Sequence, residues 1–171
     1  NLTEFALGDH SDEEIIKAFS SAKIPKDLVD DLKAYLAFAE FPLAVRSSSL
    51  LEDSHYQPFA GIYDTYFLPN NYHSLRGRIA RLLTAIKLIY ASVFCQNSRN
   101  YIEATGNRAE EEKMAIILQE IVGKNRDGQF YPVLSGLARS YNFYSVGRIK
   151  PEEGIAYIAL GLGKTVVEGE N

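Results

Sequence analysis

The sequence has very little cysteine and no excess of basic residues, and each shortage excludes a class of protein. Cys95 is the only cysteine among 171 residues, so an internal disulfide and a cysteine-ligated zinc site are both excluded. The formal net charge is −4, which argues against the broad basic face that nucleic-acid binding needs. We therefore expect no nucleic-acid partner, and we interpret Cys95 as a small apolar residue of a helix rather than a nucleophile.

Long apolar runs and targeting segments are also missing. No uninterrupted apolar stretch approaches the roughly 20 residues that a membrane helix needs. Residues 1–10 lack the basic start and apolar centre of a signal peptide. We therefore expect a cytoplasmic protein without a membrane partner. The chain begins with Asn1 rather than Met and ends just after an apolar run, so we expect both ends to be cuts in a longer protein.

Hydrophobic residues make up 46% of the chain, enough for a core, and part of them follow a helical period. Ser11 and Glu14 form a capping box at the start of a helix that should end near Ser21. Apolar residues at helical spacing predict a second helix beginning at Pro25 and a longer one over about residues 75–93. The basic residues of the longer helix are interpreted as its solvent-exposed side: Arg76, Arg78 and Arg81.

Shorter apolar segments predict strands. The segment 114–122 is so apolar that we expect a strand buried on both faces, and the polar segment 97–112 should be a frayed helix end plus a loop. Helices precede and interrupt the strands without regular βαβ alternation. We therefore expect an α+β domain, with helices packed on a mostly antiparallel or mixed sheet. The predicted strands are 43–45, 63–68, 114–122, 131–138 and 154–162.

A polar cluster suited to a phosphate chain follows the first predicted strand. Arg46, at the end of a buried strand, would present a fixed and always charged fork. Ser47 and Ser48 supply short donors, and Gly61 lets a backbone approach a ligand closely. From these residues alone an alternative stays open, in which Arg46 pairs with a loop carboxylate, Glu52 or Asp53.

Three segments occur in an order that points to one family. The first runs from Ala44-Val45-Arg46-Ser47-Ser48, through an acidic pair, to Phe59-Ala60-Gly61 and Thr65. The second, 116–122, is similar to Val-Gln-x-Met-Val, and the third, 161–169, to Gly-Leu-Gly-Glu-x-Val-Val-x-Gly. Together, over about residues 41–169, they resemble the N-terminal nucleotide domain of phosphoenolpyruvate synthases and pyruvate phosphate dikinases. The resemblance implies an ATP-grasp-like fold with two α+β lobes that close on ATP.

The resemblance also implies roles around the phosphates. Arg46 would be the catalytic residue that contacts the phosphates of ATP, with Ser47 and Ser48 beside it. The loop from Gly61 to Thr65 would cover them. The position of Lys164 is usually an acid in the family, so the lysine either adds a direct phosphate contact or marks a divergent branch.

The adenine would be held by the second segment. By the resemblance, Gln119, Glu120 and Val122 would bind ATP: the backbone after Gln119 is a hinge between the lobes, and main-chain groups of Glu120 and Val122 would bond the adenine edge. An adenine needs a donor and an acceptor in a flat apolar slot. An ordinary core strand is the plainer interpretation of this segment, and it is compatible with the functional one. A P-loop interpretation of residues 161–165 is rejected, because the upstream glycine is missing.

We expect residues 1–40 to form an N-terminal helical segment and residues 41–171 a partial ATP-grasp-like domain. By the resemblance, ATP would phosphorylate a carrier histidine in another domain, which passes the phosphoryl group to pyruvate, as in phosphoenolpyruvate synthase (pyruvate, water dikinase). The partners would be ATP, Mg2+ with ligands outside this chain, and the phosphohistidine and pyruvate-binding domains of the parent; a homodimer of the parent stays open. The isolated chain is expected to be inactive. The alternative is a non-catalytic nucleotide-sensing or subunit-contact module derived from the same fold.

Overall fold

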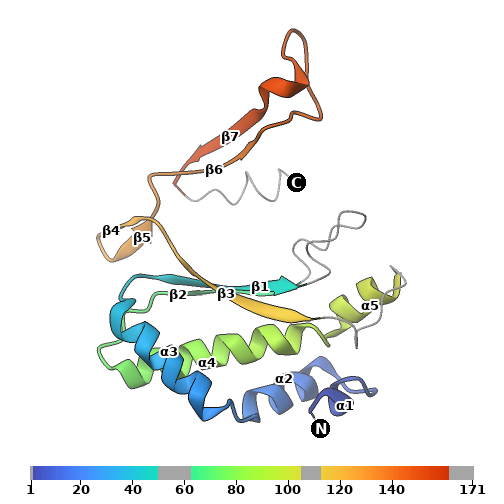
Figure 1. Ribbon diagram of the computed structural model, residues 1–171, viewed down its shortest axis with the longest axis vertical. Helices are drawn as coiled ribbons and strands as arrows, with labels where there is room; N and C mark the ends of the chain where they lie inside the picture. The colour runs from blue at the N-terminus through green and yellow to red at the C-terminus, as the bar shows by residue number, and fades with distance from the viewer. Residues whose placement is uncertain (1, 50–62, 105–112, 162–171) are drawn as a thin grey trace. The chain divides into compact units, whose positions relative to one another are not determined.

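The computed structural model describes residues 2–49, 63–104 and 113–161 (Figure 1). The chain divides into two compact units, Asn1–Ile121 and Val122–Asn171. Helices and a three-stranded sheet make up the described part of the first unit, and short hairpins make up that of the second. Helices therefore combine with antiparallel strands, as expected of an α+β protein.

The helices of the first unit begin and end largely where local signals predict. Ser11 caps α2: its Oγ accepts from Glu14 N at 3.3 Å, and its own N donates to the Glu14 carboxylate at 2.9 Å, which confirms the capping box. Two helices were not predicted, α1 and α5, so the expectation of a frayed end and loop over 97–112 is wrong for its first part. The helices are α1 (Leu2–Ala6), α2 (Asp12–Ser21), α3 (Lys26–Phe38), α4 (Leu75–Ser92) and α5 (Gln96–Ala104).

A three-stranded antiparallel sheet forms the rest of this unit, in the order β2-β1-β3. Its strands are β1 (Leu43–Ser49), β2 (Thr65–Leu68) and β3 (Met114–Glu120). β1 continues to Ser49, beyond the predicted 43–45, because it pairs with β3 from Leu43 opposite Glu120 to Ser49 opposite Met114. Because β1 is the central strand, it has paired residues on both sides, from β2 and from β3.

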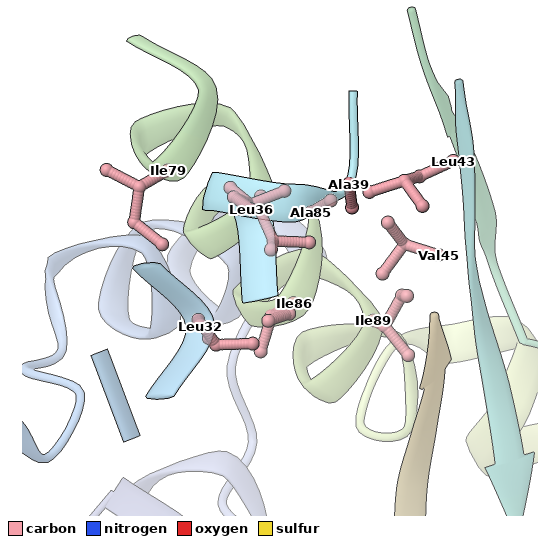
Figure 2. Packing of buried hydrophobic residues seen from close by; sticks show 10 residues of the cluster. Leu32, Leu36, Ala39, Leu43, Val45, Ile79, Ala85, Ile86 and Ile89 are labelled. Atoms are coloured by element: carbon pink, nitrogen blue, oxygen red, sulfur yellow. The ribbon is translucent and has the colours of Figure 1, made fainter. Parts of the chain in front are cut away.

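The core lies between one face of this sheet and the helices α3 and α4 (Figure 2). Leu43 and Val45 point from β1 toward Leu36 of α3 and Ile89 of α4, and all four are fully buried. On β3 the burial alternates, and Ile117 remains 45% exposed on the opposite face. The expectation that this strand is buried on both faces is therefore wrong, because the helices that the structure describes in this unit cover only one face of the sheet.

Helix α4 is the central helix of this core. The segment Leu75–Ala104 is long and apolar enough to cross a membrane by length and composition, although it contains no uninterrupted apolar run of that length. Its apolar residues have another explanation in the structure, because Ile79, Leu82 and Ile89 are buried in the core cluster.

The described part of the second unit consists of two antiparallel hairpins. Asp127 and Gly128 connect the first two strands with φ values of 53° and 82°, the conformation of a tight two-residue hairpin turn. The predicted strand 131–138 is divided in two around Pro132. The strands are β4 (Lys124–Arg126), β5 (Gln129–Tyr131), β6 (Leu134–Arg139) and β7 (Ile155–Leu160), with a short 3-10 turn at Pro151–Glu153.

Candidate functional site

The candidate site is the face of the three-stranded sheet that the core helices leave uncovered, here called the outer face. Side chains alternate between the faces of a strand, and residues directly opposite each other in neighbouring strands share a face. The register therefore assigns to the outer face Ala44, Arg46, Ser48, Thr65, Phe67, Ala115, Ile117 and Gln119.

Arg46 lies at the centre of the outer face. It is exposed, and it stands opposite Thr65 of β2 on one side and Ile117 of β3 on the other. Its Nη1 donates a hydrogen bond to Oε1 of Gln119 at 3.1 Å. Gln119 sits diagonally across from it, opposite Ala44, so the bond spans two strands and 73 residues of sequence. The structure thus brings three of the predicted site residues together: Arg46, Thr65 and Gln119.

The two serines after Arg46 are separated by the alternation of the strand. Ser48 shares the outer face with Arg46 and is partly exposed. Ser47 is 9% exposed and points to the helix-covered side. A ligand on the outer face therefore meets the Ser48 hydroxyl and not that of Ser47.

The other predicted site residues lie elsewhere. Glu120 ends β3, and its charge adds to burial in raising the pKa of Tyr35 of α3. Val122 begins the second unit and is 80% exposed. Gly61 and Lys164 lie outside the described residues, as do Glu52 and Asp53, the carboxylates of the alternative interpretation of Arg46.

Two titratable groups near the sheet have pKa values raised far above neutral pH, so neither is suited to acid–base or nucleophilic catalysis at neutral pH. Burial, followed by a hydrogen bond to Asp64 at 2.8 Å, raises the pKa of Tyr66 to about 12. Burial and the charges of Asp12 and Asp64 raise the pKa of Cys95 to about 11. Cys95 lies just after α4 rather than within a helix, and its thiol stays protonated at neutral pH, as expected for a residue that is not a nucleophile.

The basic residues of α4 are not equivalent. Arg76 and Arg81 are exposed, and Arg81 stacks on the ring of Tyr72 with its guanidinium carbon 4.3 Å from the ring centroid. Arg78 is half-buried and donates to the Ala39 carbonyl at 3.0 Å. The interpretation of this set as a solvent-exposed side is therefore correct for Arg76 and Arg81 and wrong for Arg78, which ties α4 to the end of α3.

Magnesium bound with a nucleotide takes one or two protein carboxylates, whereas an all-protein magnesium site needs several oxygen ligands in one place. Within residues 2–49, 63–104 and 113–161, no three His, Cys, Asp or Glu side chains gather as metal ligands would. The described residues therefore form no all-protein site for the ion, and no step of the proposed chemistry is assigned to it.

Sequence reasoning missed the apolar part of the outer face. Phe67 is 70% exposed on β2, and Ile117 is 45% exposed on β3. The polarity alternation that predicts β2 already contains this signal, because Phe67 is two residues from Thr65 and therefore lies on the same face of the strand. The contact between Arg46 and Gln119 had no such signal, since it depends on the register of two strands that are far apart in the sequence.

Comparisons with known proteins show what this chain is similar to. Residues 5–171 match the family described as "Pyruvate phosphate dikinase, AMP/ATP-binding domain". Rifampicin phosphotransferase of Bacillus cereus is 27% identical over 161 residues, a match that covers 92% of this chain. The chain spans 16% of the length of that relative.

Proposed function

Because the chain belongs to the family of pyruvate phosphate dikinase AMP/ATP-binding domains, we propose that its outer face binds the phosphates of ATP within a larger phosphotransferase. The observation that carries this proposal is the exposed Arg46, held by Gln119 at the centre of the sheet with Thr65 in register beside it. The guanidinium is always charged and matches the geometry of phosphate oxygens.

The surroundings of Arg46 suit a nucleotide. The hydroxyls of Ser48 and Thr65 share its face, and Phe67 and Ile117 place exposed apolar surface on the neighbouring strands. A few polar groups set in apolar surface are typical of small-molecule sites. In phosphoryl transfer, positioning and electrostatic stabilisation do most of the work, so Arg46 would stabilise the charge on the transferring phosphates.

The finer arrangement follows the family. We propose an ATP-grasp-like fold in which the segment from Gly61 to Thr65 covers the phosphates and Lys164 adds a contact to them. Main-chain groups of Glu120 and Val122 would bond the adenine.

In the full-length protein, ATP would phosphorylate a carrier histidine in another domain, and the phosphoryl group would pass to an acceptor. Pyruvate is the acceptor in the phosphoenolpyruvate synthase reaction, which is the first candidate. Rifampicin is the second candidate, because the named relative, a rifampicin phosphotransferase, matches 92% of this chain. The nucleotide-binding role is common to both.

The test compares two exposed arginines in the full-length protein by ATP-binding calorimetry. Arg46→Ala should raise the Kd for ATP about 10- to 100-fold, the range expected for losing a hydrogen bond from a charged group. The matched control is Arg76→Ala, since Arg76 is exposed on α4 and away from the outer face; it should bind ATP as the wild type does. Wild-type affinity in Arg46→Ala, or no ATP binding by the wild type, would overturn the proposal.

The acceptor is tested by incubating the wild-type protein and ATP with pyruvate or with rifampicin. The expected result is AMP, inorganic phosphate and a phosphorylated product in one of the two reactions. ATP binding without a phosphorylated histidine or product would instead identify a non-catalytic nucleotide-sensing or subunit-contact module. Ser48→Ala and Thr65→Val each remove one of the two outer-face hydroxyls. The Kd for ATP of each variant, compared with that of the wild type, measures what the hydroxyl contributes.

A further inference from the structure

We infer that Gln119 is a positioning residue, which aims the Arg46 guanidinium at a phosphate without neutralising it. The inference rests on the proposed function of the outer face. It concerns how Arg46 is held, and it assigns to the Gln119 side chain a part in anion binding that acts through another residue.

The geometry shows how Arg46 is held. Arg46 is exposed on a central strand, and an exposed arginine has many rotamers. The hydrogen bond from its Nη1 to Gln119 Oε1, 3.1 Å long, fixes one arm of the fork against β3. Gln119 lies diagonally across, within reach of a long side chain in an antiparallel pair. The bond therefore draws the guanidinium along the outer face toward β3.

The chemistry of the acceptor decides what this bond does to the charge. A carboxylate in the same place would form an ion pair with Arg46 and compete with an incoming phosphate. The glutamine amide accepts a hydrogen bond through a neutral oxygen, so the full positive charge of the guanidinium is retained. An amide at this position thus combines a fixed direction with an undiminished charge, which is what recognition of an anion requires.

Two substitutions of Gln119 in the full-length protein test the orientation of the Arg46 guanidinium separately from its positive charge. Gln119→Leu removes the acceptor and keeps much of the volume, and it should raise the Kd for ATP about 3- to 10-fold, less than Arg46→Ala does, because the guanidinium and its charge remain. Gln119→Glu keeps an acceptor but adds a negative charge, so it should weaken ATP binding as strongly as Arg46→Ala does. Adenosine, which has no phosphate, should bind all these variants equally, which also reports that the fold is intact.

A double-mutant cycle distinguishes positioning from direct contact with ATP. If Gln119 acts through Arg46, Gln119→Leu should change the Kd for ATP less than about twofold in the Arg46→Ala background. The matched control is Gln96→Leu, because Gln96 also bonds a neighbouring side chain, Asn100 at 2.6 Å, but lies on α5. This control should bind ATP like the wild type.

The outcomes separate this inference from the proposed function. Wild-type affinity in Gln119→Leu, an equal loss in both backgrounds, or unchanged affinity in Gln119→Glu would each overturn the positioning role while Arg46→Ala still weakens binding. If Arg46→Ala itself binds ATP normally, the proposed function of the outer face fails, and the inference fails with it.

Discussion

Tyr66 is a single residue whose ionisation is linked to the stability of the first unit. Its hydroxyl donates to the Asp64 carboxylate at 2.8 Å. Burial, and then this hydrogen bond, raise its pKa from 10.0 to about 12. A phenol with a higher pKa in the folded state holds its proton more tightly there than in the unfolded chain. The associated stability is therefore fully present below about pH 10 and is lost as the pH rises through about 12.

We expect the free energy of unfolding to fall as the pH rises from about 10 to about 12, and Tyr66→Phe to make this fall smaller. Urea unfolding at a series of pH values measures the slope. Cys95, with its pKa raised to about 11, contributes a fall in an overlapping range that Tyr66→Phe leaves in place. Tyr131→Phe is the control, because Tyr131 is exposed on β5. An unchanged slope in Tyr66→Phe would contradict the prediction.

At the scale of elements, hydrogen bonds from Asn70 connect the segment after β2 to the end of α3 and the start of β1. Its side-chain nitrogen donates to the Ala39 carbonyl at 2.6 Å and to the Phe41 carbonyl at 3.0 Å. The residue is 8% exposed and has a φ of 55°, which asparagine tolerates better than most residues. Asn70 is therefore expected to stabilise the arrangement that presents β1 for pairing on both sides.

Asn70→Asp removes the side-chain donor and keeps a residue that tolerates the backbone conformation of this position. Aspartate has a similar size and tolerance of positive φ, but it cannot donate to the two carbonyls. We expect Asn70→Asp to lower the free energy of unfolding by about 1–3 kcal/mol, because the Phe41 carbonyl loses this donor and a carboxylate is placed against two carbonyl oxygens, while Arg78 still donates to Ala39. Asn71→Ala, at the exposed neighbouring position, should change it by less than about 0.5 kcal/mol. Urea unfolding measures both, and equal stability of Asn70→Asp and the wild type would show that the donor is dispensable.

Elements with a local signal could be predicted from the sequence. The capping box at Ser11 and the apolar spacing in α3 and α4 depend on neighbours within a turn or two, so their helices were predicted. In α5 the buried residues are only Ser98 and Ile102, a face too narrow to be recognised among polar residues. The burial of β3 was predicted wrongly, because a run of apolar residues does not tell whether one face or both will be covered.

The candidate site was predictable residue by residue but not as an arrangement. Arg46 and Gln119 were both identified from their own segments. Their contact depends on the pairing of β1 with β3 across 73 residues, which no local pattern specifies. The same register places Ser47 and Ser48 on opposite faces, so adjacent residues of one motif have different surroundings.

At the scale of the whole molecule, the two compact units differ in how much core each one contains. The first unit has a cluster of fully buried residues that includes Leu36, Leu43 and Ile89. The described hairpins of the second unit are two-stranded and leave large apolar side chains such as Tyr144 and Leu160 mostly exposed. Isolated two-stranded hairpins are marginally stable in water. The first unit therefore has what it needs to fold by itself, and the hairpins of the second do not.

We expect residues 1–121, expressed alone, to unfold cooperatively in urea, and residues 122–171 alone to show no cooperative transition. Ile89→Ala should lower the free energy of unfolding of the first piece by about 2–5 kcal/mol, because Ile89 is fully buried in its core. Leu28→Ala is the control, since Leu28 is 44% exposed on α3. A cooperative transition in the second piece, or none in the first, would contradict this division.

Folding of residues 1–121 does not imply full affinity for ATP. This piece contains the whole outer face, including Arg46, Thr65 and Gln119, but it lacks Val122 and Lys164, which the proposed site also uses. Phosphate contacts on one sheet face leave the nucleotide in water, where each charged interaction is weak. ATP should therefore bind this piece far more weakly than the full-length protein, while Arg46→Ala still reduces what binding remains.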